Sequence, residues 1–140
     1  MAEIIWYTLL HSPLRAAEAL HDPTGDSWVH GDLRSDNICI RDGRAMFVDW
    51  SGARRGHPQT DLAEWLPTLH LEGGPEPMSV LPDAAWSSVA AARQASHAVS
   101  QTNAPAWLQR VFRRLAAINL EWAARSLDLP GPDGPDRRVT

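Results

Sequence analysis

Apolar positions recur at helical spacing through much of the second half of the chain. The clearest stripe predicts a helix from Ala106 to about Leu127 and consists of Leu108, Val111, Phe112, Leu115, Ile118 and Trp122. A stripe of smaller residues predicts a helix from Pro82-Asp83 to about Gln101 and consists of Ala85, Val89, Ala92, Ser96 and Val99. Another helix is expected to begin near Asp61, with its apolar side formed by Leu62, Trp65, Leu66 and Leu69.

The first half of the chain is divided into shorter segments. Ser12-Pro13 is typical of a helix start, and Trp28-Val29-His30 predicts a short buried strand. Residues 38–48 have the pattern of a strand, a turn and a second strand, whereas loops are expected at 51–58 and 71–82. The pattern as a whole therefore predicts an α+β fold that is mostly α-helical.

The composition is that of an ordinary globular domain. The chain has 140 residues, of which 44% are hydrophobic and 21% are charged, which fits one domain over residues 1–128. Residues 129–140 are rich in Pro, Gly and Asp and predict a disordered tail. The net charge of −4 gives no sign of binding to nucleic acid or to an anionic membrane.

Cysteine content and hydropathy bear on the cellular compartment. Cys39 is the single cysteine, so an internal disulfide cannot form and a cytoplasmic location is expected. Its position in the middle of a strand predicts a buried structural thiol. The sequence has neither a basic leader nor a run of about 18 apolar residues, so no signal peptide or membrane span is expected.

Three polar side chains have the spacing that phosphoryl transfer requires. Asp32 and Asn37 lie five positions apart in a short loop, and Asp49 follows twelve positions later, across the predicted hairpin. In such a site one carboxylate accepts the proton of the attacking hydroxyl, while an amide oxygen and a second carboxylate hold Mg²⁺ against the phosphates. Each residue also has a structural alternative: Asp32 bonded to its own loop amides, Asn37 closing a turn, and Asp49 capping a strand end.

These motifs resemble those of a known family. His30-Gly31-Asp32-Leu33 with Asn37, then Val48-Asp49-Trp50, then Asp61-Leu62-Ala63, are similar to the catalytic and metal-binding segments of the aminoglycoside phosphotransferase family. That family has a protein-kinase-like fold and includes choline-, homoserine- and fructosamine-type kinases. The resemblance is close from about Trp28 to Leu71.

The resemblance implies a function and a set of roles. It implies a kinase-like C-lobe, with catalytic and metal-binding loops over 28–50, that transfers a phosphoryl group from ATP to a small-molecule hydroxyl. Asp32 would be the catalytic base, and Asn37 and Asp49 would bind Mg²⁺ and the nucleotide cofactor. For Asp61 two roles remain open, since the family uses an Asp there to hold the catalytic-loop backbone, whereas capping-box spacing to Glu64 indicates a plain helix cap.

The register of the hairpin bears on the metal site. A two-residue Asp42-Gly43 turn would put Asn37 and Asp49 on opposite faces, whereas a three-residue loop with Gly43 left-handed would put them on one face. The three-residue loop also gives a core face, made of Ile38, Ile40, Met46 and Val48. Shared metal binding favours the three-residue loop, although either terminal residue can depart from the ideal pleat.

Parts of the family pattern are missing. The 27 residues before Trp28 contain no glycine-rich nucleotide loop, and all 13 basic side chains of the chain are Arg, so the strand lysine that pairs with ATP is absent. We therefore expect a C-lobe alone: an excised domain, a truncated reading frame or a half-enzyme, with weak ATP binding. The alternative is a non-catalytic binding or scaffolding module, or a half-enzyme that needs a partner N-lobe; an N-lobe partner or self-association is the expected protein contact.

Overall fold

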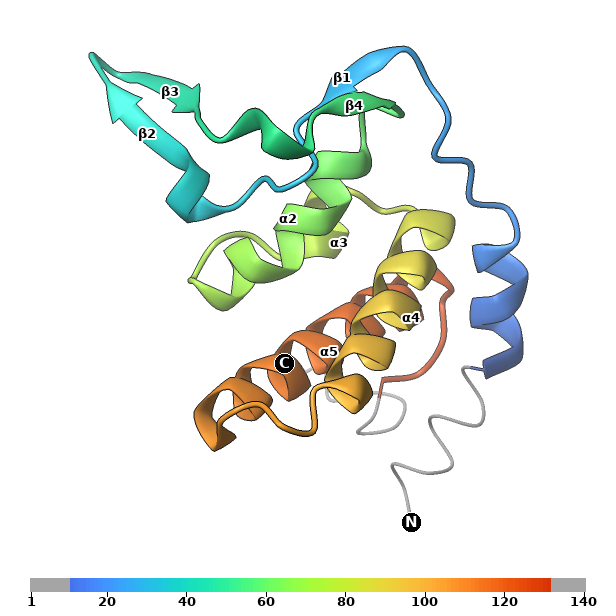
Figure 1. The fold of residues 1–140 in the computed structure, drawn as a ribbon. Helices are drawn as coiled ribbons and strands as arrows, with labels where there is room; N and C mark the ends of the chain where they lie inside the picture. Colours follow the sequence, from blue (N-terminus) through green and yellow to red (C-terminus); the bar gives the residue numbers. More distant parts are fainter. Residues whose placement is uncertain (1–10, 132–140) are drawn as a thin grey trace, which may run out of the picture. The chain divides into compact units, whose positions relative to one another are not determined.

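The computed structural model describes residues 11–131 and contains mostly helices with two small antiparallel sheets (Figure 1). The predicted α+β, mostly α-helical class is confirmed at this level. The chain divides into two compact units, Asp22–Pro77 and the combination of Met1–His21 with Met78–Thr140. The tail predicted at 129–140 falls outside the described part from residue 132 onward and stays a prediction.

Two long antiparallel helices make up most of the unit that contains Met78 and the residues after it. Helices α4 (Ala84–Ser100) and α5 (Ala106–Ser126) lie side by side (Figure 1) and agree with the predicted bounds to within about two residues. The side chain of Asp83 caps α4 by accepting hydrogen bonds from the backbone amides of Ala85 and Trp86, at 2.9 and 3.0 Å. The buried contact between the helices includes Ala91, Leu120, Ala123 and Ala124, with Leu14 and Leu129 packed against it.

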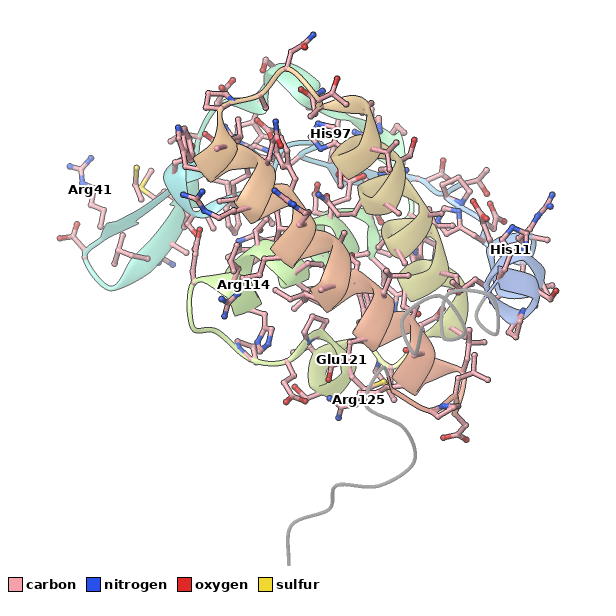
Figure 2. The ribbon with its side chains drawn as sticks, turned by 90° about the horizontal axis from the view of Figure 1, so that it is seen from below. His11, Arg41, His97, Arg114, Glu121 and Arg125 are labelled. Atoms are coloured by element: carbon pink, nitrogen blue, oxygen red, sulfur yellow. The ribbon has the colours of Figure 1, made fainter. Side chains whose placement is uncertain are left out.

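The stripe predicted for α5 is confirmed in part, with two of its six residues buried and four half-buried, while that for α4 is wrong. Leu115 and Trp122 are buried, and the indole Nε1 of Trp122 donates a hydrogen bond of 2.9 Å to the backbone oxygen of Leu81. In α4 the buried residues are Trp86, Ser87, Ser88 and Ala91, and Val99 is 77% exposed. Ala and Ser fill most of this helix, so hydropathy distinguishes its faces poorly. The labelled Arg114, Glu121 and Arg125 lie along the exposed side of α5 (Figure 2).

The unit Asp22–Pro77 carries both sheets. Strand β1 (Ser27–Val29) pairs with β4 (Arg54–Gly56), and β2 (Ile38–Arg41) pairs with β3 (Arg44–Phe47). Short 3-10 turns occur at Ser35–Asn37 and Trp50–Gly52.

Three expectations for this part of the chain are corrected. Strand β4 lies in the segment predicted as a loop at 51–58, because antiparallel pairing with β1 satisfies its backbone groups. The segment after α2 (Thr60–Leu71), predicted as a loop, contains the short helix α3 (Pro77–Val80). Trp28, predicted to be buried, is 64% exposed and stacks under the guanidinium of Arg55.

The hairpin has the two-residue turn, so the preferred three-residue loop is wrong. Arg41 pairs with Arg44, and Asp42 and Gly43 have φ values of 51° and 72°. Two successive residues with positive φ form the turn whose twist matches that of the flanking strands, and Asp-Gly is a favoured sequence for it.

This register also corrects the predicted faces of the hairpin. Met46 lies opposite Cys39, so these two side chains share one face of the hairpin, whereas Ile38 and Ile40 lie on the other face. The predicted core face, which combined Met46 with Ile38 and Ile40, therefore does not exist. Ile40 is 73% and Met46 is 48% exposed, and Cys39 is exposed instead of buried. The hairpin extends away from β1 and β4 (Figure 1), and Arg41 projects from its tip (Figure 2). In the described part of the chain, no helix is long and apolar enough to cross a membrane.

Candidate active site

The loop that follows β1 is held by a carboxylate on α2. Asp61 Oδ2 accepts a 2.6 Å hydrogen bond from the backbone amide of His30, and Oδ1 accepts one of 2.8 Å from that of Gly31. The helix cap is Gln59, without a side-chain hydrogen bond to the helix. Of the two roles left open for Asp61, holding the loop backbone is therefore the one observed. Hydrogen bonds to an ionised group are stronger than neutral ones, so two of them fix the start of the loop.

The backbone passes very close to itself at Gly31. The residue has a φ of 83°, and a Cβ atom added to it would collide with the carbonyl oxygen of Gly52. Both the left-handed conformation and the lack of space require glycine here. This close approach packs the loop against the 3-10 turn that follows Asp49.

His30 connects the loop to the end of the hairpin. Its ring is 2% exposed, its Nε2 lies 2.7 Å from the backbone oxygen of Val48, and its Nδ1 lies 3.3 Å from the backbone amide of Asp32. A carbonyl must accept and an amide must donate, so the compatible tautomer carries its proton on Nε2. The ring also packs against Trp50, with 4.7 Å between the centroids. His30 is thus a scaffolding residue of this loop.

Asp32 is exposed and oriented by two side chains. Asn37 Nδ2 donates to the backbone oxygen of Asp32 at 2.8 Å and lies 3.3 Å from its Oδ2. The other carboxylate oxygen, Oδ1, lies 3.3 Å from Arg34 Nε. The structure therefore brings together two of the three predicted site residues and leaves the Asp32 carboxylate reachable from solvent.

Arg34 has a role that the sequence did not reveal. Its Nε lies 3.3 Å from both Asp32 and Asp36, so it bridges two carboxylates. Its side chain is 54% exposed, so the ion pairs stabilise the fold by at most about 1 kcal/mol. Their clearer effect is to reduce the negative charge beside Asp32.

Asn37 is buried and tied to the hairpin. Its backbone amide donates to Arg34 at 3.0 Å, and its backbone oxygen accepts from Val48 at 2.9 Å, which continues the ladder beyond β2 and β3. Because Nδ2 faces Asp32, the amide oxygen Oδ1 is the atom of this side chain that can serve as a metal ligand.

Asp49 follows Val48 and leaves the pleat. Its φ and ψ are 58° and 64°, in the left-handed region, and its Oδ1 accepts a 2.8 Å hydrogen bond from Ser51 Oγ. The paired part of the hairpin ends at Ile38 in β2 and at Phe47 in β3. Asn37 and Asp49 lie outside it, so the length of the turn does not decide the directions of their side chains. A shared metal site stays a prediction. A serine two positions after an aspartate is the local signal that could have identified Ser51.

The available ligands suit Mg²⁺ better than a transition metal. Asn37 and Asp49 offer an amide oxygen and a carboxylate, and Mg²⁺ is usually held by one or two carboxylates together with water and substrate phosphates. Over residues 11–131, no three His, Cys, Asp or Glu side chains are grouped as they would be in an all-protein metal site. The donor set fits a magnesium ion completed by phosphate and water.

Comparison with known proteins gives a family match for the first half of the chain. The phosphotransferase enzyme family matches residues 6–66, a segment that includes Asp32, Asn37, Asp49 and Asp61. The resemblance to the aminoglycoside phosphotransferase family is thereby confirmed. No curated protein and no solved structure gives a match to the chain.

Proposed function

Since residues 6–66 are a phosphotransferase-family segment, we propose that the chain is the C-lobe of a kinase-like enzyme that transfers a phosphoryl group from ATP to a hydroxyl of a small molecule. The observation that carries the proposal is the double hydrogen bond from His30 and Gly31 to Asp61. It fixes the backbone immediately before Asp32 while the Asp32 carboxylate stays exposed to a substrate.

The residues have separate tasks in this proposal. Asp32 accepts or orients the proton of the acceptor hydroxyl, which is held in line with the phosphate. Asn37 keeps the Asp32 carboxylate in place through Nδ2. Asn37 Oδ1 and Asp49 would hold Mg²⁺, which neutralises phosphate charge when bound. Catalysis of this kind depends on positioning more than on basicity, which fits a loop fixed by several hydrogen bonds.

A second candidate is a half-enzyme or binding module that works with a separate N-lobe. The hairpin favours it, since Ile40, Met46 and Phe47 are 73%, 48% and 44% exposed. An isolated two-stranded hairpin is marginally stable in water, and exposed apolar groups on it favour association. A partner lobe or a second copy of the chain would cover this surface. We place either function in the cytoplasm, where the single thiol of Cys39 stays reduced.

Metal binding tests the site directly. Titration with Mn²⁺ followed by NMR should broaden the signals of Asn37 and Asp49 first, and Asp49→Asn should remove this broadening. Asp42→Asn is the matched control, because Asp42 is an exposed aspartate with positive φ at the other end of the hairpin. Broadening centred elsewhere, with residues 37 and 49 silent, would exclude the metal site.

Phosphoryl transfer tests the reaction. Millimolar ATP and Mg²⁺ are supplied with a panel of small hydroxyl compounds, including aminoglycosides, and the products are followed by ³¹P NMR. Asp32→Asn should abolish any transfer, whereas Asp36→Asn should retain it, because Asp36 shares the Arg34 ion pair without being the proposed base. Metal binding at Asn37 and Asp49 without transfer to any acceptor would favour the half-enzyme or binding module.

A further inference from the structure

The far end of α2 also contacts the loop that carries Asp32 and Asn37. Ser35 Oγ donates a hydrogen bond to Glu72 Oε2, across 37 positions of sequence. Ser35 is the first residue of the 3-10 turn Ser35–Asn37, and Glu72 caps the C-terminus of α2. No sequence pattern pairs residues so far apart, which explains why Glu72 was missed.

The hydrogen bonds at the C-terminal end of α2 fix the backbone at Glu72. The amide of Gly73 donates to His70 at 3.0 Å and that of Gly74 to Leu69 at 2.8 Å, the pair of bonds that defines a Schellman motif. Gly73 has a φ of 98°, and a Cβ on Gly74 would lie 2.6 Å from Leu69 Cγ. This construction leaves the backbone at Glu72 little freedom.

Helix electrostatics alone would not favour glutamate at this position. The C-terminus of a helix carries partial negative charge, so an acidic residue there is unfavourable. The hydrogen bond to Ser35 offsets that cost and gives the carboxylate a role. Both side chains are exposed, so the contact contributes orientation more than stability.

Helix α2 therefore holds the loop from both ends. Asp61, in its first turn, fixes the amides of His30 and Gly31, and Glu72, at its last, fixes Ser35. Asp32 lies between these anchor points, and Asn37 is the last residue of the 3-10 turn that begins at Ser35. The backbone oxygen of Ser35 also accepts a hydrogen bond from the backbone amide of Ile38. The position of Ser35 therefore fixes the turn that carries the Asn37 side chain.

We propose that Glu72 is a positioning residue for phosphoryl transfer, which acts through Ser35 to hold the Asn37 amide oxygen in its metal-binding orientation. This inference rests on the proposed function, because it assigns Asn37 to the metal. It predicts that loss of either partner weakens the metal site without removing a ligand.

The test compares Ser35→Ala, Glu72→Ala, the double variant and Glu72→Gln for Mn²⁺ affinity, read from broadening at Asn37 and Asp49. Each alanine variant should lose about two- to tenfold in affinity, the equivalent of one net hydrogen bond. The double variant should lose no more than either single variant, because both changes break one contact. Glu72→Gln should retain most of the affinity, since its amide oxygen can still accept from Ser35.

Glu121→Ala is the control, because Glu121 is an exposed glutamate on α5 (Figure 2) whose removal changes net charge alone. Equal affinity in all variants, or additive losses in the double variant, would overturn the role of Glu72 if Asp49→Asn still abolishes binding. If Asp49→Asn has no effect, the proposed metal site itself fails. Circular dichroism of each variant separates these results from unfolding, and rescue by Glu72→Gln would show that the hydrogen bond, not the charge, is what matters.

Discussion

The carboxylate of Asp61 accepts a hydrogen bond of 2.6 Å from the backbone amide of His30, although 31 positions separate the two residues. A helix that follows the site thus holds the start of the loop that precedes it. The same carboxylate also accepts the amide of Gly31, so both of its oxygens are used. This arrangement makes the backbone geometry just before Asp32 depend on a carboxylate of α2.

Removal of the Asp61 carboxylate should destabilise the fold and free the loop. Asp61→Ala leaves two partly buried amides unpaired, which should lower the free energy of unfolding by roughly 2–4 kcal/mol. Asp61→Asn keeps one acceptor oxygen and should lose about half as much. Denaturant melts give the stability, and hydrogen exchange at His30 and Gly31 should accelerate in both variants. Asp42→Ala, at the exposed hairpin tip, should change stability by about 0.5 kcal/mol or less, and an equal loss in both alanine variants would contradict the anchoring role.

Alanine substitutions at two glycines with positive φ test how tightly the loop is packed at Gly31. Gly31 has a φ of 83° and no room for a Cβ, whereas Gly43 has a φ of 72° and open space around it. Gly43→Ala should cost about 1–2 kcal/mol, from backbone conformation alone. Gly31→Ala adds overpacking of about 1–3 kcal/mol, so it should be clearly the more destabilising. Similar losses in thermal or urea unfolding would show that the approach to Gly52 is not tight.

Sequence reasoning succeeded where local signals and chemistry agreed. The bounds of α4 and α5 follow from capping and periodicity, and the family resemblance follows from the spacing of its motifs. The prediction for the hairpin is wrong because it rested on a shared metal site for Asn37 and Asp49, whereas Asp42-Gly43 itself favours a two-residue turn. The strand ends before Asp49, so the alternation of side chains between two faces does not determine where Asp49 points.

Other features depend on contacts that no local pattern encodes. The pairing of β1 with β4 joins segments more than twenty residues apart, and Ser35 meets Glu72 only because α2 folds back along the loop. The exposed apolar hairpin contradicts the general expectation that an alternating strand has one buried face. Prediction of a core face requires knowledge of what packs on the strand, which the hairpin sequence does not contain.

Trp122 should be a major contributor to the α4–α5 unit. Its side chain is 2% exposed, and Trp122→Ala should lower the free energy of unfolding by about 3–5 kcal/mol. Trp122→Phe keeps much of the packing and removes the 2.9 Å hydrogen bond to the oxygen of Leu81, which still accepts one of 2.9 Å from the backbone amide of Asp83. The loss of one of these two bonds should cost about 0.5–1.5 kcal/mol. Trp107→Ala is the control, since Trp107 is 60% exposed. Denaturant melts in which Trp122→Ala and Trp107→Ala differ by less than about 1 kcal/mol would show that α5 does not depend on this anchor.

ATP should bind these 140 residues weakly. A kinase-like site encloses the nucleotide between two lobes and places a lysine on its phosphates, but every basic side chain of this chain is Arg. The arginine nearest the proposed base, Arg34, is already bridged between Asp32 and Asp36. With Asp49 also exposed, negative charge is concentrated where a polyphosphate must approach, and metal is needed to offset the repulsion.

Calorimetry with ATP and excess Mg²⁺ should therefore give a Kd no tighter than roughly millimolar, which corresponds to about −4 kcal/mol. Affinity should fall further without Mg²⁺, because the carboxylates then face the phosphates directly. Addition of a separately expressed N-lobe should tighten binding if the exposed hairpin is its docking surface, since the second wall and the missing cation would be supplied together. Micromolar binding by the 140 residues alone, lost in Asp49→Asn but not in Asp42→Asn, would instead mean that the chain completes a nucleotide site by itself or as an oligomer.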